Sequence, residues 1–154
     1  MDVSSWLLHR PPGLLVTGLD HSDAARALIQ SSGLPCVHLM ETSATAGVYS
    51  VGFSQADAAA ALTRHLLGRG YRRIAFGAAQ LDARTLQRLV GWRREMQCRR
   101  SACADAGVAE PGPSSLSLGR TMFEQVVAQT PPVDAIFICN DDPVRPWTFR
   151  RRCA

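Results

Sequence analysis

The sequence predicts an α/β fold in which parallel sheets carry helices on both faces. Short, nearly continuous apolar runs alternate with segments of helical periodicity, a spacing typical of βαβ units. The apolar runs are those expected of strands that are buried on both sides. Glycines follow the helical segments, as they commonly do at helix ends. These three observations together favour a parallel sheet over an antiparallel one.

The first third of the chain contains one predicted helix and three predicted strands. The helix spans about residues 23–32, begins after Ser22 and stops at Gly33. Serine is a favoured residue at a helix N-terminus, and glycine is favoured just beyond a C-terminus. The strands are predicted over residues 13–17, 34–40 and 49–53.

The rest of the chain continues the alternation of helices and strands. A helix follows Ser54 and runs through Leu67, and its apolar positions repeat at helical spacing. The face that we expect it to bury consists of Ala58, Ala61, Leu62, His65 and Leu66. A longer helix over 84–106 is expected to end at Gly107. The remaining elements are strands over 73–77 and 134–139, a loop over 109–117 rich in Pro, Gly and Ser, and a short helix over 120–129.

Composition is ordinary for a globular domain and excludes several classes of protein. The 154 residues are 46% hydrophobic and 19% charged, and the net charge is +4. All 17 basic residues are arginines, scattered except at 99–100 and 150–152, a pattern that favours a solvated surface over a phosphate-binding one. No export signal or membrane-spanning stretch of about 18 apolar residues is present, so we expect a cytoplasmic protein without membrane association. The five cysteines lack C-x-x-C spacing, which argues against zinc.

The residues that follow the predicted strands are the candidates for ligand binding. Parallel sheets bind ligands beyond the carboxyl ends of their strands. In this chain those positions are 17–20, 40–41, 53, 78–84 and 140–142. No Ser-His-Asp arrangement, P-loop or dinucleotide-binding glycine pattern accompanies them. The sequence therefore gives no support for an enzyme, and we expect no cofactor and no metal.

Three segments, taken in order, identify a protein family more specifically than any one of them alone. The first is Val51-Gly52-Phe53-Ser54 with the helix and strand that follow it through Gly77, the second is Arg88-Leu89-Val90-Gly91-Trp92, and the third is Cys139-Asn140-Asp141-Asp142. Together they resemble the effector-binding domain of the LacI/GalR family of transcriptional regulators. Tyr71 stands where that family usually has a histidine. Residues 77–85 are most similar to the gluconate-repressor branch.

The resemblance implies a partial, periplasmic-binding-protein-like fold of type I. Residues 1–53 would be a remnant of the first effector-binding subdomain, and residues 54–142 the start of the second. Residues 143–154 depart from the family, because two prolines stand where it continues with a helix. We expect truncation at both ends, with a frameshift or similar event after Asp142 and a disordered tail; a naturally divergent terminus is the alternative. The family's helix-turn-helix is missing, so no DNA-binding residue is expected in this chain.

The resemblance also indicates which residues contact a small sugar or sugar acid in the cleft between the subdomains. Arg88 matches the family's effector-binding arginine, and Arg84 shares its helix face four residues earlier. A guanidinium suits the carboxylate of a sugar acid. The alternative is that both arginines are exposed helix residues that contact no ligand. The other expected contacts are Asn140, Asp141, Phe53 and Thr17, for which helix capping (Asn140, Asp141) and core packing (Phe53) are the alternatives.

The function predicted from these features is effector sensing for a DNA-binding repressor. By the resemblance, an intact relative closes on its sugar, changes its affinity for operator DNA through a headpiece and works as a homodimer. We expect this chain to bind sugar weakly or not at all, because missing strands would leave sheet edges open. The alternatives are the solute-binding protein of a sugar transporter, a sugar-phosphate enzyme, or a non-functional truncated product.

Overall fold

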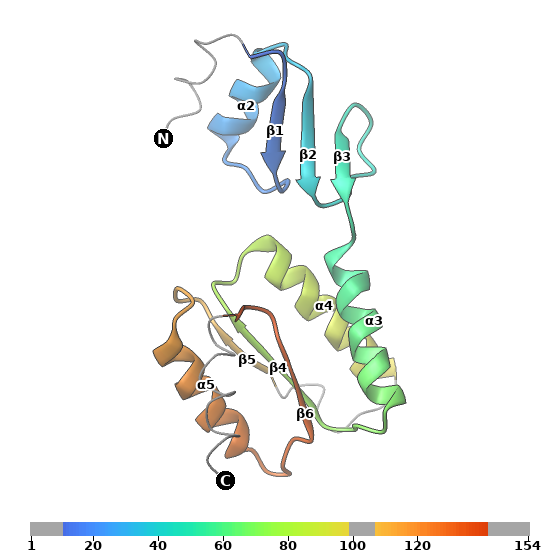
Figure 1. The fold of residues 1–154 in the computed structure, drawn as a ribbon, viewed down its shortest axis with the longest axis vertical. Helices are drawn as coiled ribbons and strands as arrows, with labels where there is room; N and C mark the ends of the chain where they lie inside the picture. The colour runs from blue at the N-terminus through green and yellow to red at the C-terminus, as the bar shows by residue number, and fades with distance from the viewer. Residues whose placement is uncertain (1–10, 99–106, 142–154) are drawn as a thin grey trace. The chain divides into compact units, whose positions relative to one another are not determined.

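The computed structural model describes residues 11–98 and 107–141, and these form two compact units (Figure 1). The first unit spans Met1–Ser54 and the second spans Gln55–Ala154. The predicted tail 143–154 lies outside the described residues, as do residues 99–106. Each unit contains one three-stranded sheet in which all neighbouring strands are parallel. The predicted α/β class with parallel sheets is therefore confirmed.

The described residues of the first unit form one helix and a sheet of order β1-β2-β3. Its helix α2 begins after Ser22, whose hydroxyl accepts a hydrogen bond from the amide of Ala25. Gly33, just beyond the helix, has the positive φ of 65° that a glycine adopts without strain. The elements are β1 (Leu14–Thr17), α2 (Asp23–Ser31), β2 (Cys36–Met40) and β3 (Tyr49–Gly52).

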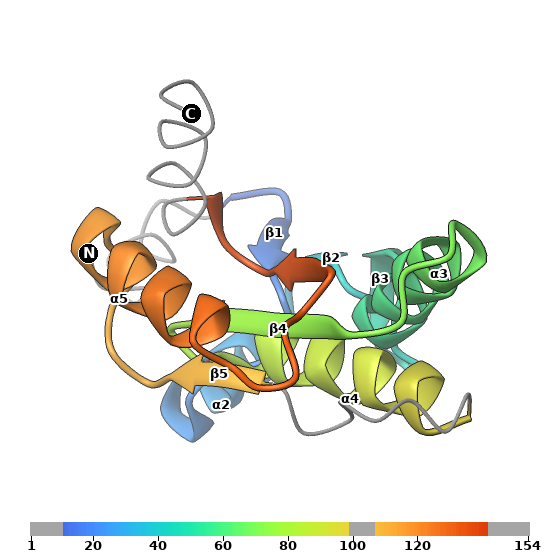
Figure 2. The same ribbon diagram turned by 90° about the horizontal axis from the view of Figure 1, so that it is seen from below.

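In the second unit, residues 55–98 and 107–141 form three helices around a sheet of order β5-β4-β6. Helices α3 and α4 pack on each other on one face of this sheet, and α5 lies on the opposite face (Figures 1 and 2). Helices thus cover both faces of the sheet, as predicted. The elements are α3 (Gln55–Gly68), β4 (Ile74–Ala79), α4 (Ala83–Cys98), β5 (Gly107–Glu110), α5 (Leu116–Val127) and β6 (Ala135–Ile138).

The hydrophobic core lies in the second unit. Every residue of the central strand β4 is buried, and Phe76 contacts Trp92 of α4 and Phe137 of β6 with ring centroids 5.4 Å apart in both pairs. On the opposite face, Met122 of α5 packs against Gly77. Within the described ranges, no hydrophobic side chain of the first unit is fully buried. Aromatic contacts in a closed core thus stabilise the second unit far more than the first.

The segment after α4 differs from the prediction. Glycine 107 was expected to end a helix and residues 109–117 to form a loop, but Gly107–Glu110 is strand β5, paired with Phe76–Ala79 of β4. The strand is short and has no apolar run, so its existence depends on pairing with a distant segment rather than on local pattern. Helix α5 begins at Leu116, earlier than predicted, because the hydroxyl of Ser115 accepts a hydrogen bond from the Leu118 amide.

Helix α3 buries a different face from the one predicted. Leu62 is 44% exposed and His65 is exposed, so the expectation of a packed core histidine was wrong. The buried face is offset by about one residue and contains small and polar side chains: Gln55, Ala59, Ala60, Thr63 and Leu67. This face meets α4 at short range, where bulky side chains would hold the two helices apart.

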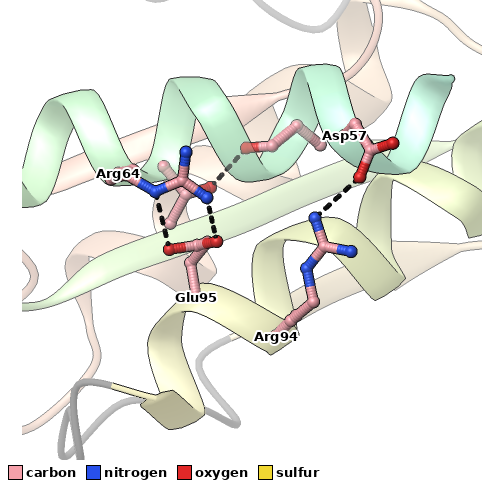
Figure 3. Close-up of polar contacts among 6 residues, drawn as sticks. Asp57, Arg64, Arg94 and Glu95 are labelled. Carbon is pink, nitrogen blue, oxygen red and sulfur yellow. Dashed lines mark hydrogen bonds and ion pairs between the residues drawn. The ribbon is translucent and has the colours of Figure 1, made fainter.

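Gly91 sets the distance between α3 and α4. A Cβ atom at this position would lie only 2.0 Å from the carbonyl oxygen of Ala56, so no side chain fits there. Two ion pairs join the same helices (Figure 3): Arg64 with Glu95, with an Nη2–Oε1 distance of 2.5 Å, and Arg94 with Asp57, at 2.8 Å. Partly exposed pairs of this kind contribute little to stability. The close backbone approach is therefore the stronger constraint.

We predict that Gly91→Ala lowers the free energy of unfolding of the second unit by about 2 kcal/mol, because the methyl group forces the helices apart. Urea unfolding followed by the fluorescence of Trp92 measures this, in a background in which Trp6 and Trp147 are replaced by phenylalanine. Gly68→Ala is the matched control, because a Cβ at Gly68 meets nothing within 4 Å. Equal stability of the two alanine variants would contradict the packing constraint.

Candidate functional site

The carboxyl ends of β4 and β6 lie side by side in the second unit. The amide of Cys139, just after β6, donates to the carbonyl of Gly77 in β4 at 2.9 Å. The side-chain oxygen of Asn140 then accepts a weaker hydrogen bond, of 3.3 Å, from the Ala79 amide at the end of β4. Asn140 therefore bridges the two strand ends. Its side-chain NH2 group carries two hydrogen-bond donors.

Arg88 is held at this edge by acceptors from two other elements. Its Nε donates to Oε1 of Gln55 in α3 at 2.8 Å, and its Nη1 donates to the carbonyl oxygen of Cys139 at 3.0 Å. The side chain is half-buried. Two hydrogen bonds in different directions restrict the rotation of a planar guanidinium. Arg88 is thus fixed in place, rather than being the plain exposed helix residue of the alternative interpretation.

The start of α4 is capped by Asp82, which also pairs with Arg84. Oδ1 of Asp82 accepts from the Thr85 amide at 2.7 Å, and Oδ2 lies 3.3 Å from Nη2 of Arg84. Burial opposes the ionisation of Asp82, but the hydrogen bonds from Thr85 and the neighbouring Arg84 outweigh it and hold the pKa of Asp82 below its ordinary value. A carboxylate at the first turn of a helix is also favoured by the helix dipole.

The predicted contact residues fall into two groups. Arg84, Arg88 and Asn140 all lie at the carboxyl edge of the second unit's sheet, where Asp141 follows with an exposed side chain. Thr17 and Phe53 belong to the first unit. Both lie at carboxyl ends of strands, where ligand contacts were predicted, because Thr17 ends β1 and Phe53 comes directly after β3. Phe53 is 50% exposed, which disagrees with the alternative that it is a core residue.

The corresponding edge of the first unit is tightly packed around Glu41. This side chain is only 4% exposed, and its Oε2 accepts from the Leu19 amide at 2.7 Å. Gly52 comes so close that a Cβ on it would lie 2.3 Å from the Glu41 amide nitrogen. A ring nitrogen of His38, Nδ1, lies 2.9 Å from the carbonyl oxygen of Gly18. The carboxyl group of Glu41 thus holds the loop after β1 through this hydrogen bond.

Gln55 is the member of this arrangement that sequence reasoning missed. Its side chain is 1% exposed and accepts the hydrogen bond from Arg88. A signal for it exists, since Gln55 shares one helix face with Ala59 and Thr63, and a buried polar side chain requires a partner. The identity of that partner, 33 residues away in sequence, follows only from the fold.

Cys139 meets Arg88 through both its carbonyl group and its thiol. Burial raises the pKa of the Cys139 thiol to about 11, and the nearby Arg88 offsets this only in part. A thiol with so high a pKa stays protonated near neutral pH and is a poor nucleophile. Among the described residues, no three His, Cys, Asp or Glu side chains gather where they could hold a metal ion.

No helix in the described ranges combines the length and the apolar character needed to cross a membrane.

Comparison with known proteins places these features among sugar-binding domains. Residues 2–145 match the family described as periplasmic binding proteins and sugar binding domain of LacI family. The chain is 45% identical over 142 residues to the HTH-type transcriptional regulator GntR of Pseudomonas aeruginosa, covering 91% of this chain and 41% of that protein. It is 32% identical over 135 residues to GntR of Escherichia coli K12, covering 84% of this chain and 39% of that protein.

The solved structures agree with the sequence comparison. The transcription regulator GntR from Chromobacterium violaceum is 40% identical with a TM-score of 0.88, over 98% of this chain and 55% of that chain. A LacI family transcriptional regulator from Silicibacter pomeroyi is 28% identical with a TM-score of 0.85, over 98% of this chain and 57% of that chain. The chain thus spans about two fifths of the length of the curated relatives, and just over half of these solved chains.

We predict that Asp82→Ala lowers the free energy of unfolding by about 1 kcal/mol at pH 7, because α4 loses its N-terminal cap. The pKa of Asp82 is lowered in the folded state, so its contribution is complete above the unfolded-state pKa of about 3.9 and is lost as the pH falls through the folded-state value. The difference between wild type and variant should therefore shrink in acid.

Urea unfolding at pH 7 and at several acidic pH values measures this difference. Asp82→Asn is the matched control, since asparagine also caps helices and should retain most of the stability at pH 7. A wild type and an Asp82→Ala variant of equal stability at pH 7 would show that the cap contributes nothing.

Proposed function

Because this chain belongs to the LacI family of transcriptional regulators and is a partial effector domain of one, we propose that it senses a sugar acid such as gluconate. The LacI family is not a family of enzymes, and its members bind sugar effectors. The curated relatives are named as transcriptional regulators, which favours regulation over solute transport. Similarity of residues 77–85 to the gluconate-repressor branch supports a sugar acid as the effector.

The fixed guanidinium of Arg88 is the observation that carries this proposal. An arginine has five N–H donors; Nε of Arg88 donates to Gln55, Nη1 donates to the carbonyl oxygen of Cys139, and the Cys139 thiol interacts with the same guanidinium. The Nη2 group carries two further N–H donors, which we assign to the ligand. A half-buried, oriented guanidinium forms two parallel hydrogen bonds with a carboxylate, which a neutral sugar cannot reproduce.

The hydroxyl groups of the sugar acid would be bound by the neighbouring polar residues. The side-chain NH2 of Asn140 is a donor for a sugar oxygen, while its Oδ1 already accepts from Ala79. Arg84, oriented by Asp82, adds further N–H donors near the ligand's carboxylate, while Asp82 offsets its positive charge. Asp141, Thr17 and Phe53 stay in the proposal as further contacts, the first two to hydroxyl groups and Phe53 to the apolar face of the ligand.

The partners and location of the whole regulator form the second part of the proposal. We infer that the regulator acts on operator DNA through a headpiece outside this chain, as a homodimer in the cytoplasm. Effector binding then changes the affinity for the operator, because a ligand that prefers one of two conformations shifts the balance between them. The names of the relatives as HTH-type regulators support this view.

We predict that the 154-residue chain binds gluconate more tightly than sorbitol, which has similar hydroxyl groups but no carboxylate. Titration followed by chemical-shift changes in two-dimensional NMR, extended into the millimolar range, measures both affinities. Arg88→Lys keeps the charge but loses the planar fork, and should weaken gluconate binding about 30-fold, as expected for a lost charge-assisted hydrogen bond.

Arg93→Ala is the matched control, since Arg93 is an exposed arginine on the same helix. It should leave gluconate binding unchanged. Equal affinity for gluconate and sorbitol, or no binding of either, would contradict the proposal. A titration that saturates at micromolar gluconate would support it, and would overturn the weak affinity expected from the sequence.

A further inference from the structure

We propose that Gln55 is a positioning residue that sets how Arg88 meets an anionic ligand, an inference that rests on the proposed function. Gln55 is the first residue of α3, directly after the segment that leaves β3. It is 1% exposed, and it engages the one N–H of the guanidinium that is attached to the side-chain stem, at 2.8 Å. Gln55 need not touch the ligand to act, because it acts through Arg88.

The hydrogen bond from Nε selects one edge of the guanidinium. A carboxylate can bind arginine side-on, through Nε and one Nη, or end-on, through the two Nη groups. The side-on mode requires the Nε proton, which Gln55 already accepts. Cys139 accepts one Nη1 proton from another direction and leaves Nη2 and the second Nη1 proton. Arg88 therefore presents its end-on edge to the carboxylate.

The neutrality of Gln55 matters as much as its acceptor oxygen. A glutamate of the same length could accept the same Nε proton, but its negative charge would pair with Arg88 and repel an incoming carboxylate. Of the neighbouring carboxylates, Asp82 is already paired with Arg84, and Asp141 is exposed to solvent. A neutral acceptor thus leaves the positive charge of Arg88 for the ligand. The structure assigns the preference for an acid over a neutral polyol to residue 55 as well as to Arg88.

Two variants of equal side-chain length separate the acceptor from the charge. Gln55→Met removes the acceptor and keeps most of the volume, whereas Gln55→Glu keeps an acceptor oxygen and adds a charge. The first readout is the Nε–H signal of Arg88 in ¹⁵N NMR, assigned by its disappearance in Arg88→Lys. The second is the affinity of the 154-residue chain for gluconate and for sorbitol. Thermal unfolding of each variant monitors the fold.

We expect a slowly exchanging Nε–H signal in the wild type and in Gln55→Glu, and a rapidly exchanging one in Gln55→Met. Gluconate affinity should fall about tenfold in Gln55→Met, equivalent to one lost hydrogen bond, while sorbitol affinity stays the same. Gln55→Glu should lose the preference for gluconate over sorbitol. Rescue of the Nε–H signal by glutamate, without rescue of gluconate binding, is a result that a purely structural glutamine does not produce.

The inference would be overturned if Gln55→Met lowered only the unfolding temperature and left the Nε–H signal and gluconate affinity unchanged. It would also be overturned if Gln55→Glu bound gluconate as tightly as the wild type. Should the wild type bind no gluconate, the proposed function fails, and with it the ligand preference assigned to Gln55. The Nε–H comparison between wild type and Gln55→Met then still shows whether Gln55 orients Arg88, so the two failures are distinguishable.

Discussion

The close approach of α3 and α4 at Gly91 is the constraint on which the rest of the second unit depends. With no side chain at Gly91, the helix backbones meet at Ala56. Gln55 directly precedes Ala56, and Arg88 lies nearly one helical turn before Gly91. The contact between Ala56 and Gly91 therefore brings Gln55 within hydrogen-bonding distance of Arg88. On the following position, Trp92 enters the core beside Phe76. One turn of α4 thus carries the proposed binding group, the helix contact and the core anchor.

Much of this arrangement could be predicted from local sequence. Apolar runs located five of the six strands in the described residues, and serines and glycines located both ends of α2 and α3, because strand burial and helix capping are short-range effects. The rule that parallel sheets bind ligands at carboxyl ends identified the edge where Arg84 and Asn140 lie. The spacing of Arg88, Gly91 and Trp92 added the arginine through resemblance to a family.

What the sequence could not reveal depends on contacts between distant segments. Strand β5 has too few apolar residues to be recognised alone, and it exists because β4 offers free backbone groups to pair with. The buried face of α3 was misjudged because Leu62 is the more hydrophobic choice, whereas the short distance to α4 selects Ala59, Ala60 and Thr63. The role of Gln55 has the same origin, since a partner 33 residues away has no local signature.

The unequal cores of the two units have a consequence for how the chain opens. Hydrophobic burial supplies most of the free energy that resists unfolding, and in the described residues it is concentrated between Gln55 and Ile138. Residues 11–54 are therefore the segment whose backbone amides exchange first and whose peptide bonds a protease reaches first. Loss of that segment would leave Arg88, Gln55 and Cys139 joined as before, because all three belong to the unit that stays closed.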